Sequence, residues 1–203
     1  MVKTLKIPRI YARKRWHSVQ FEIGESNWGD AFPNYAQTDV AAAYDKDYLY
    51  LSFLVNSPSF RLENHADQSP VSEDCCVEAF FQPVEGGEYW NFEFNAGGWL
   101  NASHRLTRPN PTRLTADELA TVSRKAMDAD LRPKAGEAGA WTLSVSIPFK
   151  LMGIKAKRGT RIRANFYSCA SKADKPYYQS WNAIGTERPD FHRPEFFGEI
   201  ELG

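Results

Sequence analysis

The clearest pattern in the chain is an alternation of aromatic and polar side chains over Tyr89–Asn95. Successive side chains of a strand point to opposite faces, so this segment is predicted to be a strand with two unlike faces. One face is apolar and is expected to anchor the strand in a core: Trp90, Phe92 and Phe94. The other carries a ring, two amides and a carboxylate, which is chemistry suited to hydroxyl-rich ligands: Tyr89, Asn91, Glu93 and Asn95. The alternative is a plain amphipathic strand whose polar face is solvated.

Further strands follow at short intervals, with almost no helical periodicity. Residues 75–81 are apolar except for Glu78, which predicts a strand covered on both faces. The turn signal at residues 85–87 favours antiparallel pairing of this strand with Tyr89–Asn95. Other predicted elements are a hairpin at 40–44 and 48–55, a helical turn at 148–152, and strands at 99–106, 119–127, 141–147, 161–169 and 198–202. The succession predicts an all-β fold, an antiparallel β-sandwich of jelly-roll or immunoglobulin-like type with little helix.

Length and charge narrow the class of protein. At 203 residues the chain can bury a full core, and we expect a single domain over residues 1–203. Lysine plus arginine and aspartate plus glutamate both number 25, so no net field attracts nucleic acid or an anionic membrane. No apolar run has membrane-spanning length, and the start lacks a signal-peptide core. We therefore expect a cytoplasmic protein, or an exported one whose signal was removed before this numbering begins.

The three cysteines do not form a disulfide framework. Cys75 and Cys76 are adjacent, so a strand directs their side chains to opposite faces, and Cys169 is distant in sequence. A bridge from one of the pair to Cys169 is the alternative, but the odd count favours free buried thiols. No CxxC or histidine-rich spacing indicates a zinc site.

Glu78 is the side chain whose burial needs an explanation, because an unpaired buried charge is costly. One interpretation is a salt bridge to an arginine such as Arg163. Another is an acceptor for ligand hydroxyls at the floor of a binding site, and the two are compatible. A catalytic alternative pairs Glu78 with Glu93 as the acid and base of a glycoside hydrolase.

Two aromatic residues near the C-terminal end are candidates for ligand stacking. Trp181 and Phe191 either seal one end of the sandwich or offer flat surfaces to the CH-rich face of a sugar ring. His192 beside Arg193 suggests a metal or anion site only weakly, since no second histidine stands at ligand spacing.

Several blocks of the sequence together resemble family 9-like carbohydrate-binding modules, which share a DOMON-type β-sandwich. The first block is residues 69–81, Ser-Pro-Val-Ser-Glu-Asp-Cys-Cys-Val-Glu-Ala-Phe-Phe, and Tyr89–Asn95 follows as Tyr-Trp-Asn-Phe-Glu-Phe-Asn. Residues 141–149, 164–169, 180–182 and 189–198 resemble the later blocks, in order. The similarity runs from about residue 28 to the end.

This resemblance implies non-catalytic recognition of a glycan, at its reducing end in the best-studied relatives. It also implies a role in polysaccharide catabolism, beside glycoside hydrolases that act on the same glycan. Relatives clamp a sugar between two tryptophans and hold its hydroxyls with polar side chains. Val71 and Ser72 stand in the neighbourhood of the N-terminal clamp tryptophan, and Phe191 stands near the C-terminal one. Glu93 stands where relatives carry an arginine.

The predicted site is a shallow sugar site with a polar wall and aromatic flanks, formed by Glu78, Asn91, Glu93, Asn95, Trp181 and Phe191. No cofactor is predicted. Calcium is left open, with Glu73 and Asp74 as candidate ligands beside loop carbonyls. A second alternative is binding of haem or a small metabolite, because DOMON-like sandwiches also host haem through Met and His ligands. The candidate haem ligands are Met127 or Met152 with His104 or His192.

Overall fold

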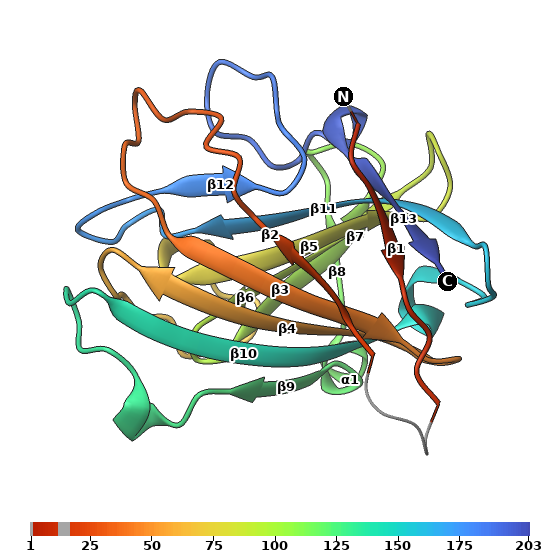
Figure 1. The fold of residues 1–203 in the computed structure, drawn as a ribbon, viewed down its shortest axis with the longest axis horizontal. Coiled ribbons are helices and arrows are strands. Elements are labelled where there is room, and N and C mark those ends of the chain that lie inside the picture. The colour runs from red at the N-terminus through yellow and green to blue at the C-terminus, as the bar shows by residue number, and fades with distance from the viewer. Residues whose placement is uncertain (1, 12–16) are drawn as a thin grey trace.

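The computed structural model describes residues 2–11 and 17–203 and shows two β-sheets packed face to face (Figure 1). Over these residues the larger sheet has the order β1-β13-β11-β5-β6-β7-β8, with β12 paired to β11, and the smaller sheet has the order β2-β3-β4-β10-β9. The strands are β1 (Thr4–Ile7), β2 (Val19–Glu22), β3 (Gln37–Tyr44), β4 (Tyr48–Ser57), β5 (Cys76–Gln82), β6 (Tyr89–Asn95), β7 (Leu100–Arg105), β8 (Thr112–Arg113), β9 (Ser123–Ala126), β10 (Gly139–Pro148), β11 (Arg161–Cys169), β12 (Tyr178–Ser180) and β13 (Gly198–Leu202). The predicted antiparallel β-sandwich is confirmed.

Helix is confined to short turns in the described part of the chain. They are α1 (Ala116–Ala120) and the 3₁₀ turns η1 (Val71–Glu73), η2 (Ala129–Leu131), η3 (Phe149–Met152) and η4 (Pro194–Phe196). The predicted helical turn at residues 148–152 is confirmed by η3. None of the helices in residues 2–11 and 17–203 is long and apolar enough to span a bilayer.

The predicted strand at residues 119–127 is wrong at its start. Thr115 accepts a hydrogen bond from the Glu118 backbone, and the Glu118 side chain accepts one from the Thr115 backbone, so a capping box begins α1. The strand β9 starts only at Ser123. The local cap therefore outweighs the apolar pattern that follows it.

Strand pairing agrees with the sequence patterns. β3 and β4 form the predicted hairpin, and β5 pairs with β6 in antiparallel register. Every residue of β5 is buried, as expected for a strand covered on both faces. The predicted strand at residues 198–202 is β13. β1, which the sequence did not indicate, runs parallel to it at the edge of the larger sheet, with Thr4 opposite Glu199 and Ile7 opposite Leu202.

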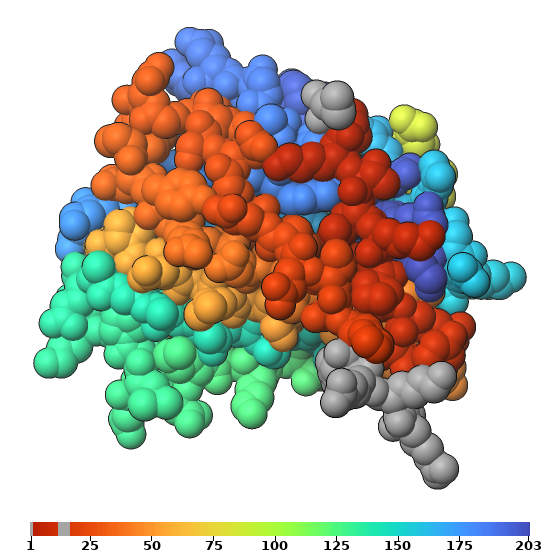
Figure 2. All heavy atoms as spheres, viewed as in Figure 1, coloured from red at the N-terminus to blue at the C-terminus, as the bar shows by residue number. Residues whose placement is uncertain are grey.

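The main core lies between the two sheets. Inward-facing rings of β4, β6 and β10 meet there, including Phe53, Phe92 and Trp141, each at most 2% exposed. Along β3, β4 and β10 of the smaller sheet, buried and more exposed side chains alternate. The more exposed ones form the outer face of this sheet, which makes up much of the surface seen in Figure 2. The smaller sheet thus has one buried face and one solvent-exposed face, as is common for antiparallel sheets.

The larger sheet is different, because its outer face is also buried. A second apolar cluster packs there under the segment 182–197: Trp28, Val71, Cys76, Phe80, Tyr89, Tyr167, Cys169, Ile184, Phe191 and Phe197. Asn165 and Asn182 fix the segment, since Asn165 Nδ2 donates to the Asn182 carbonyl and the Asn182 backbone donates to Asn165 Oδ1, at 3.0 and 2.9 Å. The polar face of β6 is thus covered, and the alternative of a solvated amphipathic strand is wrong.

Trp181 belongs to the core between the sheets. It is 4% exposed and meets Phe166 edge-on, with ring centroids 5.7 Å apart. Gly198 lies against it so closely that an added Cβ would stand 2.5 Å from Trp181 Cζ3. The Trp181 indole therefore occupies the space that a side chain at position 198 would need.

We predict that Trp181→Ala lowers the free energy of unfolding by about 3–5 kcal/mol, because it leaves a cavity in a packed core. Urea denaturation followed by far-UV circular dichroism measures the change. Trp99→Ala is the control: Trp99 is 36% exposed, so its loss should stay within about 0.5 kcal/mol. Equal losses in the two variants would contradict the placement of Trp181.

Candidate functional site

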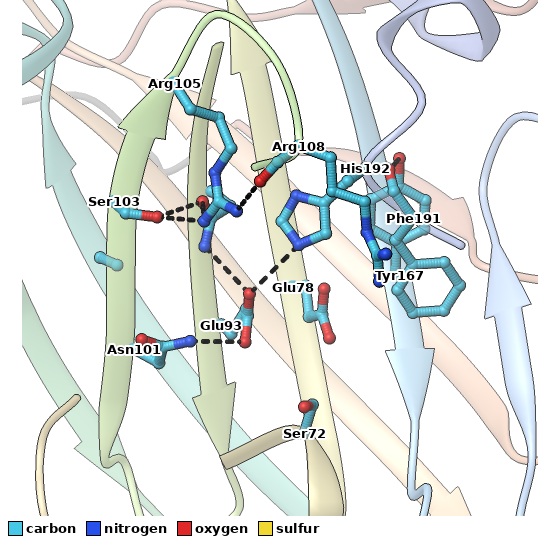
Figure 3. A network of polar contacts seen from close by, with 12 residues as sticks. Ser72, Glu78, Glu93, Asn101, Ser103, Arg105, Arg108, Tyr167, Phe191 and His192 are labelled. Carbon is cyan, nitrogen blue, oxygen red and sulfur yellow. Dashed lines mark hydrogen bonds and ion pairs between the residues drawn. The ribbon is translucent and has the colours of Figure 1, made fainter. Parts of the chain in front are cut away.

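A cavity of about 170 Å³ opens on the outer face of the larger sheet, where β5, β6 and β11 each contribute a side chain. Strand residues supply its floor and loop residues supply its walls and rim. The lining consists of Ser72, Glu78, Glu93, Arg108, Cys169, Ser171, Tyr178, Pro189, Asp190, Phe191 and His192. Figure 3 shows the polar part of this arrangement.

Two carboxylates form the floor. Glu78 and Glu93 are direct partners in the register of β5 and β6, so their side chains project from the same face. They are 3% and 7% exposed. Both residues belong to the predicted sugar site, and both line the cavity.

Glu93 is held by two amides. Asn91 Nδ2 donates to Glu93 Oε1 and Asn101 Nδ2 donates to Glu93 Oε2, each at 2.9 Å (Figure 3). Burial raises the pKa of Glu93, while these amides and the Arg105 guanidinium oppose the rise. The Asn91 side chain is fully buried, and its amide fixes the orientation of the Glu93 carboxylate.

Arg105 ties this floor to a loop. Its guanidinium Nη2 donates to Asn91 Oδ1 at 3.0 Å and contacts Ser103 Oγ, and its Nη1 donates to the Arg108 carbonyl at 3.0 Å. The loop then places the Arg108 side chain in the cavity lining, where its Nε lies 3.3 Å from Asp190 Oδ1. Sequence analysis did not single out Arg108.

His192 presents a neutral ring to the cavity. Burial, with Arg105 and Arg108 nearby, lowers the pKa of His192 to about 3. Burial raises the pKa of Tyr89 to about 12, so the Tyr89 hydroxyl keeps its proton, and its oxygen lies 3.1 Å from His192 Nδ1. This hydrogen bond fits either tautomer of a neutral ring; we assign the ring proton to Nε2, because that nitrogen lies 4.0 Å from the acceptor Glu93 Oε1. An N–H donor and a carboxylate acceptor stand next to each other.

Aromatic rings form one side of the cavity. Phe191 stacks on Tyr167, with centroids 4.2 Å apart and an interplanar angle of 9°, and the Tyr167 hydroxyl donates to the Phe191 carbonyl at 3.1 Å. Tyr178 meets Phe191 edge-on at 6.2 Å and is half-buried. Phe191 thus lines the site as expected, whereas Tyr178 was not among the predicted residues.

Glu78 does not pair with Arg163, and that interpretation is wrong. Arg163 instead donates to Glu85 Oε1 at 3.3 Å and to the Pro194 carbonyl at 2.9 Å. The neighbours of the Glu78 carboxyl are thiols, with Cys169 Sγ at 3.4 Å and Cys76 Sγ at 4.0 Å from Oε1. Burial raises the pKa of Glu78 well above its usual range, and the nearby Cys169 and Glu93 raise it further.

Two of the predicted site residues lie elsewhere. Trp181 is in the core between the sheets, on the other side of the larger sheet from the cavity. Asn95 is fully buried at the end of β6, where its Nδ2 donates to the Asn64 carbonyl at 2.8 Å and to Asp74 Oδ2 at 3.0 Å. Alternation gave Asn95 the correct face, but its amide is used to fix a loop.

A calcium site at Glu73 and Asp74 does not fit the structure. Asp74 accepts N–H groups from Glu63, Asn64 and Asn95, at 2.9 to 3.2 Å, so its lone pairs face donors. Glu73 pairs with Lys172 at 2.9 Å. Asp74, whose two oxygens already accept these N–H groups, is therefore poorly placed to bind a hard cation.

A Met–His pair for haem is not assembled at the cavity either. Met152 is buried in the core between the sheets, and Met127 packs against the same core. His104 lies 3.0 Å from Glu88 and stacks on Trp90, so only His192 of the four candidates lines the cavity.

The comparisons with known proteins bear on what this cavity does. Carbohydrate-binding family 9 matches residues 8–202, which is nearly the whole sequence. The chain belongs to carbohydrate-binding family 9. Modules of this family bind carbohydrate and are not catalytic, so Glu78 and Glu93 are not the acid and base of a hydrolase. A comparison with curated proteins found no significant match.

Solved structures support the family fold. A candidate carbohydrate-binding protein from Bacteroides uniformis ATCC 8492 superposes with a TM-score of 0.87 at 26% identity, over 100% of both chains. A family 9 module from Caldicellulosiruptor kristjanssonii in complex with glucose has a TM-score of 0.60 at 13% identity and covers 99% of this chain and 96% of its own. A family 9 module from the same organism in complex with cellotriose has a TM-score of 0.58 at 14% identity, over 98% and 93%.

The raised pKa of Glu78 predicts a pH-dependent stability in this family 9 module. The folded state holds a proton that the unfolded state releases above about pH 4.5, so the contribution is fully present below that pH and is lost as pH rises through the folded pKa. Glu78→Gln, which has no proton to lose, should therefore gain stability over the wild type as pH increases. Thermal unfolding at several pH values in metal-free buffer measures this. Glu85→Gln, at an 83% exposed side chain, should show no such trend, and parallel profiles for all three proteins would refute the prediction.

The depressed pKa of His192 predicts that its ring stays neutral in the folded protein down to about pH 3. Long-range ¹⁵N–¹H spectra should show the proton on Nε2 at pH 7 and no titration of this ring near pH 6.5. Tyr89→Phe removes the hydroxyl that bonds Nδ1, so it should shift the Nδ1 resonance and leave the other histidines unchanged. A ring that titrates at the value of free histidine would show that the burial seen here is wrong.

Proposed function

We propose that the cavity binds one terminal sugar residue of a glycan. The observation that carries this proposal is the combination, around about 170 Å³, of aromatic rings on one side with fixed hydrogen-bonding groups on the other. The volume is below the ~300–1,000 Å³ of typical small-molecule pockets, so it suits a single pyranose better than a chain lying across the surface.

The polar groups match the alternating donors and acceptors of a sugar ring. The Glu93 carboxylate accepts hydrogen bonds, and the His192 Nε2–H beside it donates. Arg108 donates from the rim and is steered by Asp190. A ring hydroxyl both donates and accepts, so a neighbouring donor and acceptor can satisfy one hydroxyl at a time.

Glu78 contributes from the deepest part of the floor. Because burial favours its protonated form, the carboxyl group has an O–H to donate as well as a lone pair to offer. It can therefore bind a hydroxyl without placing a second full negative charge next to Glu93. This differs from the simple acceptor role that the sequence suggested.

Phe191 and Tyr178 supply the apolar side. The CH-rich face of a pyranose packs well on an aromatic ring, and Phe191 is held rigidly by its stacking on Tyr167. On the side of Ser72 and Ser171 the lining is polar, which agrees with the lack of a second clamp tryptophan there. With one aromatic side and hydrogen bonds of about 0.5–1.5 kcal/mol each, we expect a weak binder.

The relatives suggest which sugars to test first. The two Caldicellulosiruptor kristjanssonii modules are solved with glucose and with cellotriose, so we propose β-glucan ends as the first ligands. We further propose that the module serves glycoside hydrolases that act on the same glycan. A glycan array and a binding assay with polysaccharide test which glycan is bound, independently of where the site lies.

We predict that Tyr178→Ala weakens the affinity for the ligand at least about tenfold, a loss of about 1.4 kcal/mol, whereas Tyr178→Phe keeps most of it because the ring remains. A glycan array identifies a ligand, and isothermal titration calorimetry with that ligand and with glucose and cellotriose measures the affinities.

Tyr48→Ala is the matched control for this prediction. Tyr48 lines a wider hollow of about 790 Å³ elsewhere on the molecule, beside Lys46, Asp117 and Leu151. If Tyr48→Ala abolishes binding and Tyr178→Ala does not, sugar binds in that hollow and the proposed site is wrong. Arg108→Met tests the rim in the same titration and should also weaken binding.

A further inference from the structure

Two cysteines and a glutamate meet at the floor of the cavity. Cys76 and Cys169 are direct partners across β5 and β11, and Glu78 follows Cys76 on the same face of β5. One ligand atom from each of the three residues lies within 4.8 Å of the other two. The three side chains are buried, at 0%, 1% and 3% exposed for Cys76, Cys169 and Glu78.

The spacing of these atoms fits a tetrahedral cation. Zinc binds thiolate sulfur at ~2.3 Å and carboxylate oxygen at ~2.0 Å, so a tetrahedral site requires sulfur–oxygen separations of about 3.5 Å. The two separations in the structure, 3.4 Å from Cys169 Sγ and 4.0 Å from Cys76 Sγ to the same Glu78 oxygen, lie on either side of this value.

The carboxyl group of Glu78 also lacks a good partner in the described part of the chain. Its hydrogen bonds come from the thiols of Cys76 and Cys169, which are weak donors, whereas the neighbouring Glu93 accepts from two amides. A nearly buried carboxylate in this position is costly unless a proton or a cation neutralises it. A divalent ion supplies that charge and a bond to each of the three atoms.

The geometry points to a Zn²⁺ site formed by Cys76, Glu78 and Cys169, a property beyond sugar binding that shares only Glu78 with it. Soft sulfur ligands select a thiophilic ion over calcium or magnesium. Glu78 and Cys169 line the cavity, so the fourth coordination position faces it and is open to water or to a ligand hydroxyl.

Sequence spacing did not indicate this site, because the pattern of a usual zinc motif is absent. Cys76 and Glu78 stand two positions apart on β5. Cys169 lies on β11, 91 residues after Glu78 in the sequence. Only the register of β5 and β11 brings them together.

The test is a metal titration of the full chain, reduced with a phosphine and freed of metal by a chelator. Co²⁺ should bind one equivalent and give intense sulfur-to-cobalt charge-transfer absorption with the visible bands of a tetrahedral ion, and Zn²⁺ should displace it. X-ray absorption at the zinc edge of the wild-type complex should show two sulfur ligands. Absence of sulfur from that spectrum, or no binding below millimolar Zn²⁺, would overturn the proposal.

Three serine variants separate the site from general thiol chemistry. Cys76→Ser and Cys169→Ser should each weaken Zn²⁺ binding at least tenfold. Cys75→Ser is the matched control, because Cys75 is the sequence neighbour of Cys76 but points into the core between the sheets. Equal affinity in all three variants would refute the assignment. If a variant does not fold, protection of Cys169 from alkylation by Zn²⁺ in the wild type gives the same information.

The two proposals fail separately in these experiments. Tyr178→Ala should lose sugar affinity and keep the cobalt spectrum, since Tyr178 contributes no metal ligand. Cys76→Ser should lose the cobalt spectrum and bind sugar in metal-free buffer as the wild type does. Loss of the cobalt spectrum in Tyr178→Ala would show that the ion binds elsewhere in the cavity.

Discussion

The segment 182–197 covers the outer face of β5, β6 and β11, and the cavity exists because this cover is held in place. The paired hydrogen bonds of Asn165 and Asn182 fix its start, and the Tyr167 hydroxyl holds the Phe191 carbonyl. Arg163 fixes its end through the Pro194 carbonyl. Each anchor comes from β11. The outer face of this sheet, which would otherwise be exposed to solvent, thereby becomes a second, partly polar core, and the site is an opening into that core.

Covering this face decides the charge states inside it. Removing water raises the pKa values of Glu78 and Glu93 and lowers that of His192, so the site gains neutral donors and acceptors at the expense of charges. Hydrogen bonds in such a medium are stronger than in water, and groups already held by neighbours lose little entropy when a ligand arrives. The site is therefore built for polar, uncharged ligands, which is the chemistry of most sugars.

The sequence was informative about which face of its own strand a side chain occupies. Alternation placed Asn91 and Glu93 on a common face of β6, and adjacency placed Cys75 and Cys76 on opposite faces. It was uninformative about loops and very short strands: no periodicity encodes how the loop residues Arg108 and Asp190, or Tyr178 at the start of β12, reach the cavity. Trp181 was assigned to the site because a lone tryptophan carries no signal of direction, and the structure turns it into the core. Asn95 shows that the correct face is not enough, since its amide serves a loop.

The parallel pairing of β1 with β13 has a mechanical consequence. The strands run in the same direction, with Thr4 opposite Glu199 and Ile7 opposite Leu202, and backbone bonds continue the ladder at Lys3 and Gly203. A tensile force applied between the start of β1 and the end of β13 pulls the two parallel strands past each other in opposite directions. It therefore loads all rungs of the ladder at once, in shear, instead of opening them one after another. A module tethered to an insoluble polymer through these two ends would resist tension by the sum of its bonds.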